Sequence, residues 1–191
     1  MIEHIFPSPL YYSQVRNNNK IKYHIDRCID NVEFTKKKEW SSPHWLAPSD
    51  FNSNILKDLG IHSLLDEIDY HIEEYCNELS FKKRPYQILS WFSKFTRDDY
   101  AIEHNHNDAD ISGVYYYQTK DDAPEIYFTS PNPYLDTTQC YKPKGNITWK
   151  HSPTEGKIIL FPGWLKHGVY RNNSDDIRIS ISFNIFFKSQ R

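Results

Sequence analysis

Two histidines separated by one residue, His104 and His106, are followed two residues later by Asp108. Side chains at positions i and i+2 of an extended backbone point to the same side, so two of these three groups can reach one ion. A third histidine, His167, lies much further along the chain and can complete a set of three ligands from a distant strand. This spacing predicts a mononuclear metal site.

The segment 178–185 alternates strictly between polar and apolar residues. Such alternation is typical of a strand with one polar and one apolar face. The polar face can hold an anion, and its members are Arg178, Ser180, Ser182 and Asn184. An ordinary amphipathic strand whose polar face lies in water explains the same pattern.

The whole chain sets limits on the fold and on the partners. Its 191 residues are expected to form a single domain with a substantial core. A formal net charge of −2 gives no electrostatic case for nucleic acid or a membrane surface. Three widely spaced cysteines favour a reducing compartment over a disulfide framework. No signal peptide or membrane-spanning run is visible, so a cytoplasmic protein is expected.

One long helix and several short strands are expected. Apolar residues recur at helical spacing from Ile61 to Leu79, and Ser63 with Asp66 resembles a capping box. His62 and His71, both on this helix, are expected at the surface rather than as ligands. Residues 16–39 are polar, with a turn expected at 17–19. Strands are expected over 87–95, 111–117, 126–128 and 158–161, with an edge strand within 5–15.

This order of elements predicts a mainly β protein with flanking helices (α+β), built as an antiparallel jelly roll. Its N-terminal part, about 1–86, is expected to support a core over about 87–187. Aromatic residues of two long loops could line an opening to the site: Trp40, Trp45, Tyr134, Tyr141 and Trp149.

Three motifs in this order, HxHxxxxxSGVYYY (104–117), EGKIILFPxWLxHxV (155–169) and RISISFN (178–184), resemble the 2-oxoglutarate/Fe(II)-dependent oxygenases, a family related to the prolyl hydroxylases. The resemblance spans roughly residues 88–187. It implies a double-stranded β-helix, a cupin-like jelly roll that holds Fe(II) and uses 2-oxoglutarate and dioxygen. The implied reaction converts 2-oxoglutarate to succinate and carbon dioxide while hydroxylating an amino acid, a peptide or a small molecule.

The resemblance also implies roles for single residues. His167 takes the place of the distal metal ligand. Arg178 with Ser180 resembles the RxS pair that holds the far carboxylate of 2-oxoglutarate, since a guanidinium can meet a carboxylate with two parallel bonds. Tyr116 stands where related enzymes offer a phenol to that carboxylate, although simple packing explains a buried tyrosine equally well. No catalytic residue beyond the metal ligands is expected.

The first pair of ligands departs from the HxD pattern of most members, which leaves three sets open. His106 with Asp108 gives two histidines and a carboxylate. His104 with His106 gives three histidines. His104 with Asp108 requires a bent loop. All four groups together would crowd the open positions that catalysis needs.

Two other functions fit parts of the pattern. A cupin-like metal-dependent dioxygenase or isomerase without 2-oxoglutarate is favoured if three histidines bind iron and Arg178 is exposed. A non-catalytic jelly-roll binding module, in which the histidines are incidental, is separated from both enzymes by metal analysis.

Overall fold

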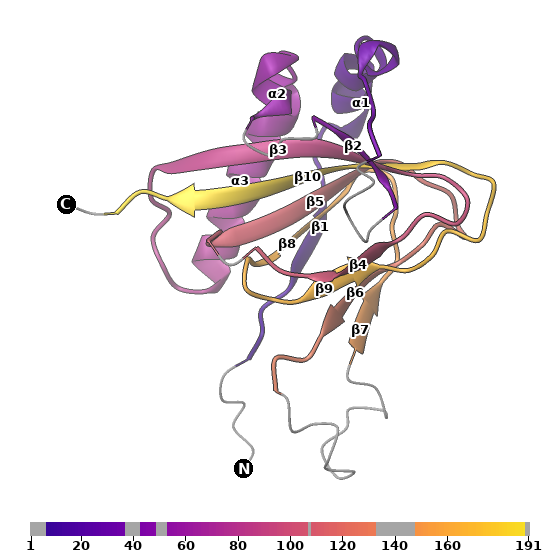
Figure 1. The fold of residues 1–191 in the computed structure, drawn as a ribbon. Coiled ribbons are helices and arrows are strands. Elements are labelled where there is room, and N and C mark those ends of the chain that lie inside the picture. The colour runs from indigo at the N-terminus through magenta and orange to yellow at the C-terminus, as the bar shows by residue number, and fades with distance from the viewer. Residues whose placement is uncertain (1–6, 37–42, 49–52, 107, 133–147, 190–191) are drawn as a thin grey trace.

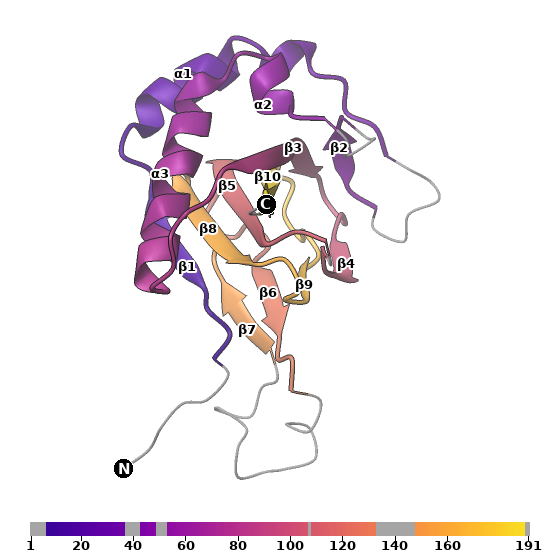
Figure 2. The same ribbon diagram turned by 90° about the vertical axis from the view of Figure 1, so that its left-hand side faces the viewer.

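Two antiparallel sheets face each other in the computed structural model, which describes residues 7–36, 43–48, 53–106, 108–132 and 148–189. The large sheet has six strands in the order β1-β8-β5-β10-β3-β2, and the small sheet has four in the order β4-β9-β6-β7. Figure 1 shows the helices on one side of the large sheet and the small sheet on the other, and Figure 2 shows the same layers after a quarter turn.

The large sheet consists of β1 (Tyr11–Gln14), β2 (Trp45–Ala47), β3 (Tyr86–Phe95), β5 (Ile111–Gln118), β8 (Lys157–Pro162) and β10 (Arg178–Phe187). The small sheet consists of β4 (Ala101–His104), β6 (Ile126–Thr129), β7 (Thr148–His151) and β9 (His167–Val169). The helices are α1 (Asn18–Asp26), the 3-10 turn η1 (Ile29–Asn31), α2 (Ile55–Asp58) and α3 (His62–Glu78). None of the helices in the described part of the chain combines the length and apolar character needed to cross a bilayer.

The apolar core has two main parts, one on each face of the large sheet. The larger cluster joins the sheet to the helices and contains Ile68 and Ile72 of α3 together with Ile181 and Phe183 of β10. The smaller cluster fills part of the space between the two sheets, where Phe128 and Phe161 meet edge to face with ring centroids 5.0 Å apart. The apolar face of β10 therefore packs toward the helices, as its alternation predicts.

The turn expected at 17–19 is partly confirmed, because a turn covers 16–17 but Asn18 and Asn19 belong to helix α1. This helix buries only two residues, Ile21 and Ile25, one helical turn apart, while the rest of its surface is polar. Packing against α3, rather than a strong local pattern, stabilises it.

Helix α3 confirms the expected helix but not its details. It begins at His62 without a side-chain cap, and the Ser63 hydroxyl shares a 2.8 Å hydrogen bond with His24 instead. The capping-box prediction was therefore wrong. His62 is exposed, as expected, but His71 is buried and shares a 2.7 Å hydrogen bond with the Tyr11 hydroxyl.

Candidate metal and co-substrate site

Strand pairing in the small sheet brings distant histidines together. Strands β4 and β9 are neighbours, and their register places His104 opposite His167. His106 lies two residues beyond the end of β4, where its amide donates to the Gly163 carbonyl at 2.8 Å. Gly163 belongs to the turn that follows β8, so this bond ties the histidine segment to the large sheet.

The three histidines form a compact cluster in which one ligand nitrogen of each lies within 4.8 Å of the others. Nδ1 of His104 lies 2.8 Å from the Ile102 carbonyl, and Nδ1 of His167 lies 2.9 Å from the Leu165 carbonyl. A carbonyl oxygen only accepts, so in both rings Nδ1 carries the proton and Nε2 keeps the free electron pair. This is how proteins orient histidines for metal binding.

Burial keeps two of these imidazoles uncharged at neutral pH. It lowers the pKa of His106 to about 4, with a further contribution from the nearby His104. It also lowers the pKa of His167 well below its ordinary value, again with His104 as the next cause. Neutral imidazole is the form that binds a metal, and nitrogen donors of this kind suit iron among other first-row metals. The donor set therefore fits Fe(II).

A second polar group, Arg178 at the start of β10, is buried and forms no ion pair with any acidic residue in the described part of the chain. It is 2% exposed, and its Nε and Nη1 atoms have no hydrogen-bond partner. Its Cζ atom lies 4.7 Å from the ring centre of Phe95 and 5.1 Å from that of Tyr116. Burial lowers the pKa of Arg178, which Tyr116 partly offsets. An unpaired buried cation is costly, so this arrangement favours an anionic ligand.

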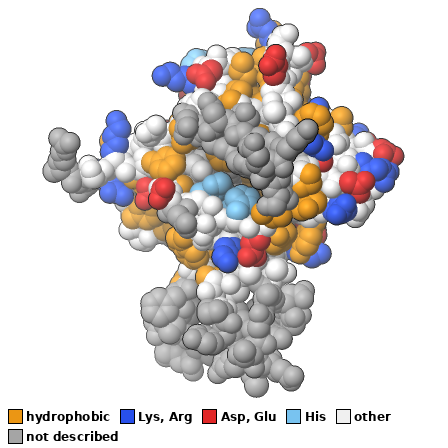
Figure 3. Space-filling view, viewed as in Figure 1, with side chains coloured by type: hydrophobic (Ala, Val, Ile, Leu, Met, Phe, Trp, Pro, Cys, Tyr) orange, Lys and Arg blue, Asp and Glu red, His pale blue; other side chains and the backbone are white. Residues whose placement is uncertain are grey.

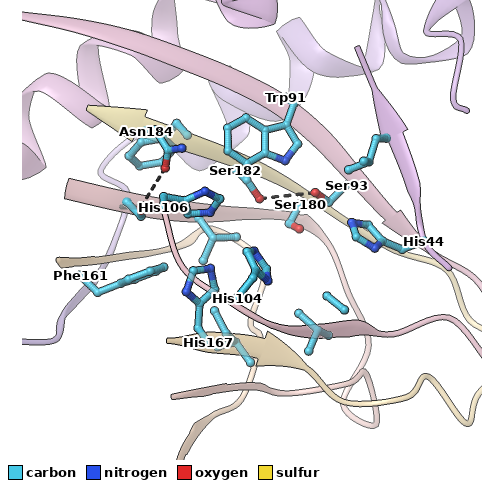
Figure 4. A pocket seen from close by; sticks show the side chains of 18 of the residues that line it. His44, Trp91, Ser93, His104, His106, Phe161, His167, Ser180, Ser182 and Asn184 are labelled. Carbon is cyan, nitrogen blue, oxygen red and sulfur yellow. Dashed lines mark hydrogen bonds between the residues drawn. The ribbon is translucent and has the colours of Figure 1, made fainter. Parts of the chain in front are cut away.

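The histidine cluster and Arg178 belong to the same cavity, which has a volume of about 560 Å³. Figure 4 shows it between the two sheets, and Figure 3 shows histidine side chains next to a hollow in the centre of one face. None of the described residues that line it is acidic. The polar face of β10 forms one wall, with Arg178, Ser180, Ser182 and Asn184.

A family model described as "Putative 2OG-Fe(II) oxygenase" matches residues 89–184, about half of the chain, and this stretch carries all three histidines and Arg178. The chain belongs to the 2OG-Fe(II) oxygenase family. Fe(II), 2-oxoglutarate and dioxygen are the cofactor and co-substrates of such an enzyme. No curated protein matches the sequence.

Solved structures of other 2OG-Fe(II) oxygenases share the fold at low sequence identity. A prolyl-4-hydroxylase from Pseudomonas putida is 11% identical, with a TM-score of 0.63 over 95% of this chain and 94% of that one. HygX from Streptomyces hygroscopicus, with nickel and 2-oxoglutarate bound, is 10% identical, with a TM-score of 0.66 over 95% and 84%. The epimerase SnoN from nogalamycin biosynthesis is 12% identical, with a TM-score of 0.66 over 94% and 77%. These similarities confirm the double-stranded β-helix.

The 2OG-Fe(II) oxygenase site gathers most, but not all, of the residues that the sequence singled out. Asp108 is exposed and is not a member of the histidine cluster. Tyr116 is fully buried beside Arg178 and does not line the cavity. Trp45 and Trp149 do not line the cavity either. Three further predictions, for Trp40, Tyr134 and Tyr141, fall outside the described residues.

Several cavity residues were not assigned a role from the sequence. Trp91 and Ser93 belong to β3, where period-two alternation could have placed them on one face with Phe95. Trp91 meets His106 edge to face, with ring centroids 5.8 Å apart. His44 lies just before β2, and no motif in the sequence surrounds it.

Proposed function

We propose that this 2OG-Fe(II) oxygenase is a hydroxylase that acts on an amino acid, a peptide or a small molecule. When bound, Fe(II) would activate dioxygen, so that one oxygen atom enters succinate as 2-oxoglutarate loses carbon dioxide and the other enters a substrate C–H bond. Prolyl hydroxylases from Pseudomonas putida and Trichoplax adhaerens among the similar structures support hydroxylation.

In this proposal three histidines hold the metal. His104 and His167 bind it through Nε2, and His106 binds it through the nitrogen that faces the cluster. Three protein ligands leave open positions for the 2-oxo acid and for dioxygen. Asp108 takes no part, because it lies outside the cluster. Of the three histidines, His167 is buried and meets Phe161 edge to face, whereas His104 is exposed.

Arg178 is the observation that carries the co-substrate assignment. Its guanidinium is buried and unpaired, and it lies on the cavity wall next to Ser180. A distal carboxylate of 2-oxoglutarate would supply the missing charge and accept from both side chains. Tyr116 lies beside Arg178 but does not line the cavity, so it is given no direct contact with this carboxylate.

The cupin-like alternative meets one of its two conditions. Three clustered histidines favour it, but it also requires an exposed Arg178, and this residue is 2% exposed. A metal-dependent enzyme without 2-oxoglutarate gives no reason for a buried, unpaired guanidinium in the metal cavity.

Replacement of Arg178 by Leu tests the proposal. Arg178→Leu should leave Fe(II) binding unchanged but weaken 2-oxoglutarate binding by about 2–5 kcal/mol, because a buried charge-assisted pair is lost. Arg178→Lys should restore only part of the affinity, since lysine keeps the charge but not the two-pronged geometry. The measurement is the visible absorption band that forms when 2-oxoglutarate chelates Fe(II) without oxygen, followed by succinate formation after oxygen is admitted.

The matched control is Arg171→Leu, which removes an exposed arginine whose partner is Asp98. It should behave as wild type. Iron binding with neither the band nor succinate in the wild-type protein would favour the cupin-like enzyme. A protein that takes up no iron would be the binding module.

A further inference from the structure

Three side chains form a row on the cavity face of the large sheet: one just before β2, one on β3 and one on β10. In the β2–β3 pair, Trp45 lies opposite Lys94, which places the preceding His44 beside Phe95. In the β3–β10 pair, Phe95 lies opposite Arg178. All three members of the row, His44, Phe95 and Arg178, line the cavity.

Ring contacts join the three members of the row. The imidazole of His44 is parallel to the ring of Phe95, with an interplanar angle of 3° and ring centroids 4.8 Å apart. The Arg178 guanidinium lies over the same phenyl ring, with its Cζ atom 4.7 Å from the ring centre. His44 is 8% exposed, and its Nδ1 atom has no hydrogen-bond partner.

Arg178 depends on these rings for its position. Its Nε and Nη1 atoms have no hydrogen-bond partner among the described residues, and the rings of Phe95 and Tyr116 lie against the guanidinium. His44, which lies just before the edge strand β2, packs flat against the ring of Phe95. Removing the imidazole would let the phenyl ring tilt and the guanidinium lose its orientation.

His44 can share this space with a cation because it is uncharged. Burial lowers the pKa of His44 to about 4, and the charges of His104 and Arg178 lower it further, while Asp99 and a backbone contact at Tyr100 raise it. A neutral ring stacks on Phe95 without repelling the guanidinium.

We propose that His44 is a positioning residue for 2-oxoglutarate, which holds Arg178 through Phe95 in the orientation that receives the distal carboxylate. The inference rests on the proposed co-substrate role of Arg178. It assigns to the N-terminal part of the chain, outside the matched residues 89–184, a share in the co-substrate site.

The test compares two 2-oxo acids on the Fe(II)-loaded full chain without oxygen. 2-Oxoglutarate has the distal carboxylate, whereas 2-oxobutanoate has the same metal-chelating group and lacks it. His44→Ala should weaken 2-oxoglutarate binding about three- to tenfold, the range for loss of one aromatic pair. Affinity for 2-oxobutanoate should not change, and His44→Phe, which keeps a flat ring, should stay within about twofold of wild type for both acids.

A double-mutant cycle links the effect to Arg178. In an Arg178→Leu background, His44→Ala should cause no further loss of 2-oxoglutarate affinity, because the group that it positions is gone. The matched control is His151→Ala, which removes a histidine of β7 that lies outside the cavity and whose ring is tilted against that of Tyr12, with centroids 4.6 Å apart. This control should bind both acids as wild type does.

Four results would overturn the inference. They are wild-type affinity in His44→Ala, equal weakening of both acids, additive effects in the double mutant, or a His44→Phe variant as weak as His44→Ala. The last would mean that a ring nitrogen touches the ligand directly. The proposed function fails separately, if the wild-type protein does not bind 2-oxoglutarate or if Arg178→Leu does not weaken it.

Discussion

The proton on Nδ1 of His104 and of His167 decides which nitrogen each ring offers to a metal. Each Nδ1 donates to a backbone carbonyl two residues earlier, at 2.8 Å and 2.9 Å. A backbone carbonyl cannot change its protonation state, so it fixes the tautomer more firmly than a titratable side chain would. Both Nε2 atoms are thereby prepared for a metal before it arrives.

Single substitutions separate the ligand sets that the sequence left open. His104→Ala should weaken Fe(II) binding more than about 100-fold, because losing a ligand costs more than losing a group that supports one. Asp108→Ala should leave it unchanged, because Asp108 is exposed and outside the cluster. Anaerobic Fe(II) titration measures both. A large loss of Fe(II) affinity in Asp108→Ala would instead favour the ligand set with His106 and Asp108.

Among the elements, β10 is the one whose role the sequence predicted most fully. Period-two alternation is a local property, so the division into a core face and a cavity face could be predicted from 178–185 alone. The histidine segment was harder, because the i, i+2 rule holds only for extended chain. The strand ends at His104, and the backbone beyond it directs His106 into the cluster while Asp108 lies outside.

Contacts between distant segments explain the other errors in predicting the elements. His71 is buried because its partner Tyr11 lies on β1, and Ser63 gives up a capping role because His24 of α1 reaches it. Neither partner is near in sequence. His44 was missed for the same reason, since only the pairing of β2 with β3 brings it to Phe95.

The turn after β8 provides a test at this scale. A Cβ atom on Gly163 would lie 2.1 Å from the Ala109 carbonyl oxygen and 2.8 Å from that of His106. Both obstacles are backbone atoms, so Gly163→Ala must displace the segment that carries His106. We expect Fe(II) affinity to fall by about tenfold or more and stability by about 1–3 kcal/mol, as for other overpacked sites.

Fe(II) titration and urea unfolding measure the two effects. Gly60→Ala is the comparison, because Gly60 has a positive φ of 68° but no atom within 4 Å of the added Cβ. It should cost about 1–2 kcal/mol of stability and leave Fe(II) affinity unchanged. Normal Fe(II) affinity in Gly163→Ala would show that this turn does not position His106.

The molecule as a whole should be sensitive to mild acid. Burial lowers the pKa values of five histidines, and the values for His44 and His106 fall to about 4. Below the ordinary histidine pKa of about 6.5 the unfolded chain binds more protons than the folded one. The free energy of unfolding of the metal-free protein should therefore fall as the pH drops from about 6.5 towards 4.

Urea unfolding at pH 7.5 and pH 5 measures this slope. A single group whose pKa changes from about 6.5 to about 4 contributes about 2 kcal/mol of the difference. His44→Phe removes that group but keeps the stack, so its stability should fall less between the two pH values. An identical slope in the variant would mean that His44 is not neutral in the folded protein.

In the proposed ligand set, His104 and His167 would hold the metal between two of the shortest strands. Strands β4 and β9 have four and three residues, and the helices cover the other sheet. Such short strands gain little from their own ladder hydrogen bonds, so an ion bound to both would supply much of the order of the small sheet. Order and iron occupancy are then thermodynamically linked: whatever loosens this sheet releases iron, and whatever removes iron loosens the sheet.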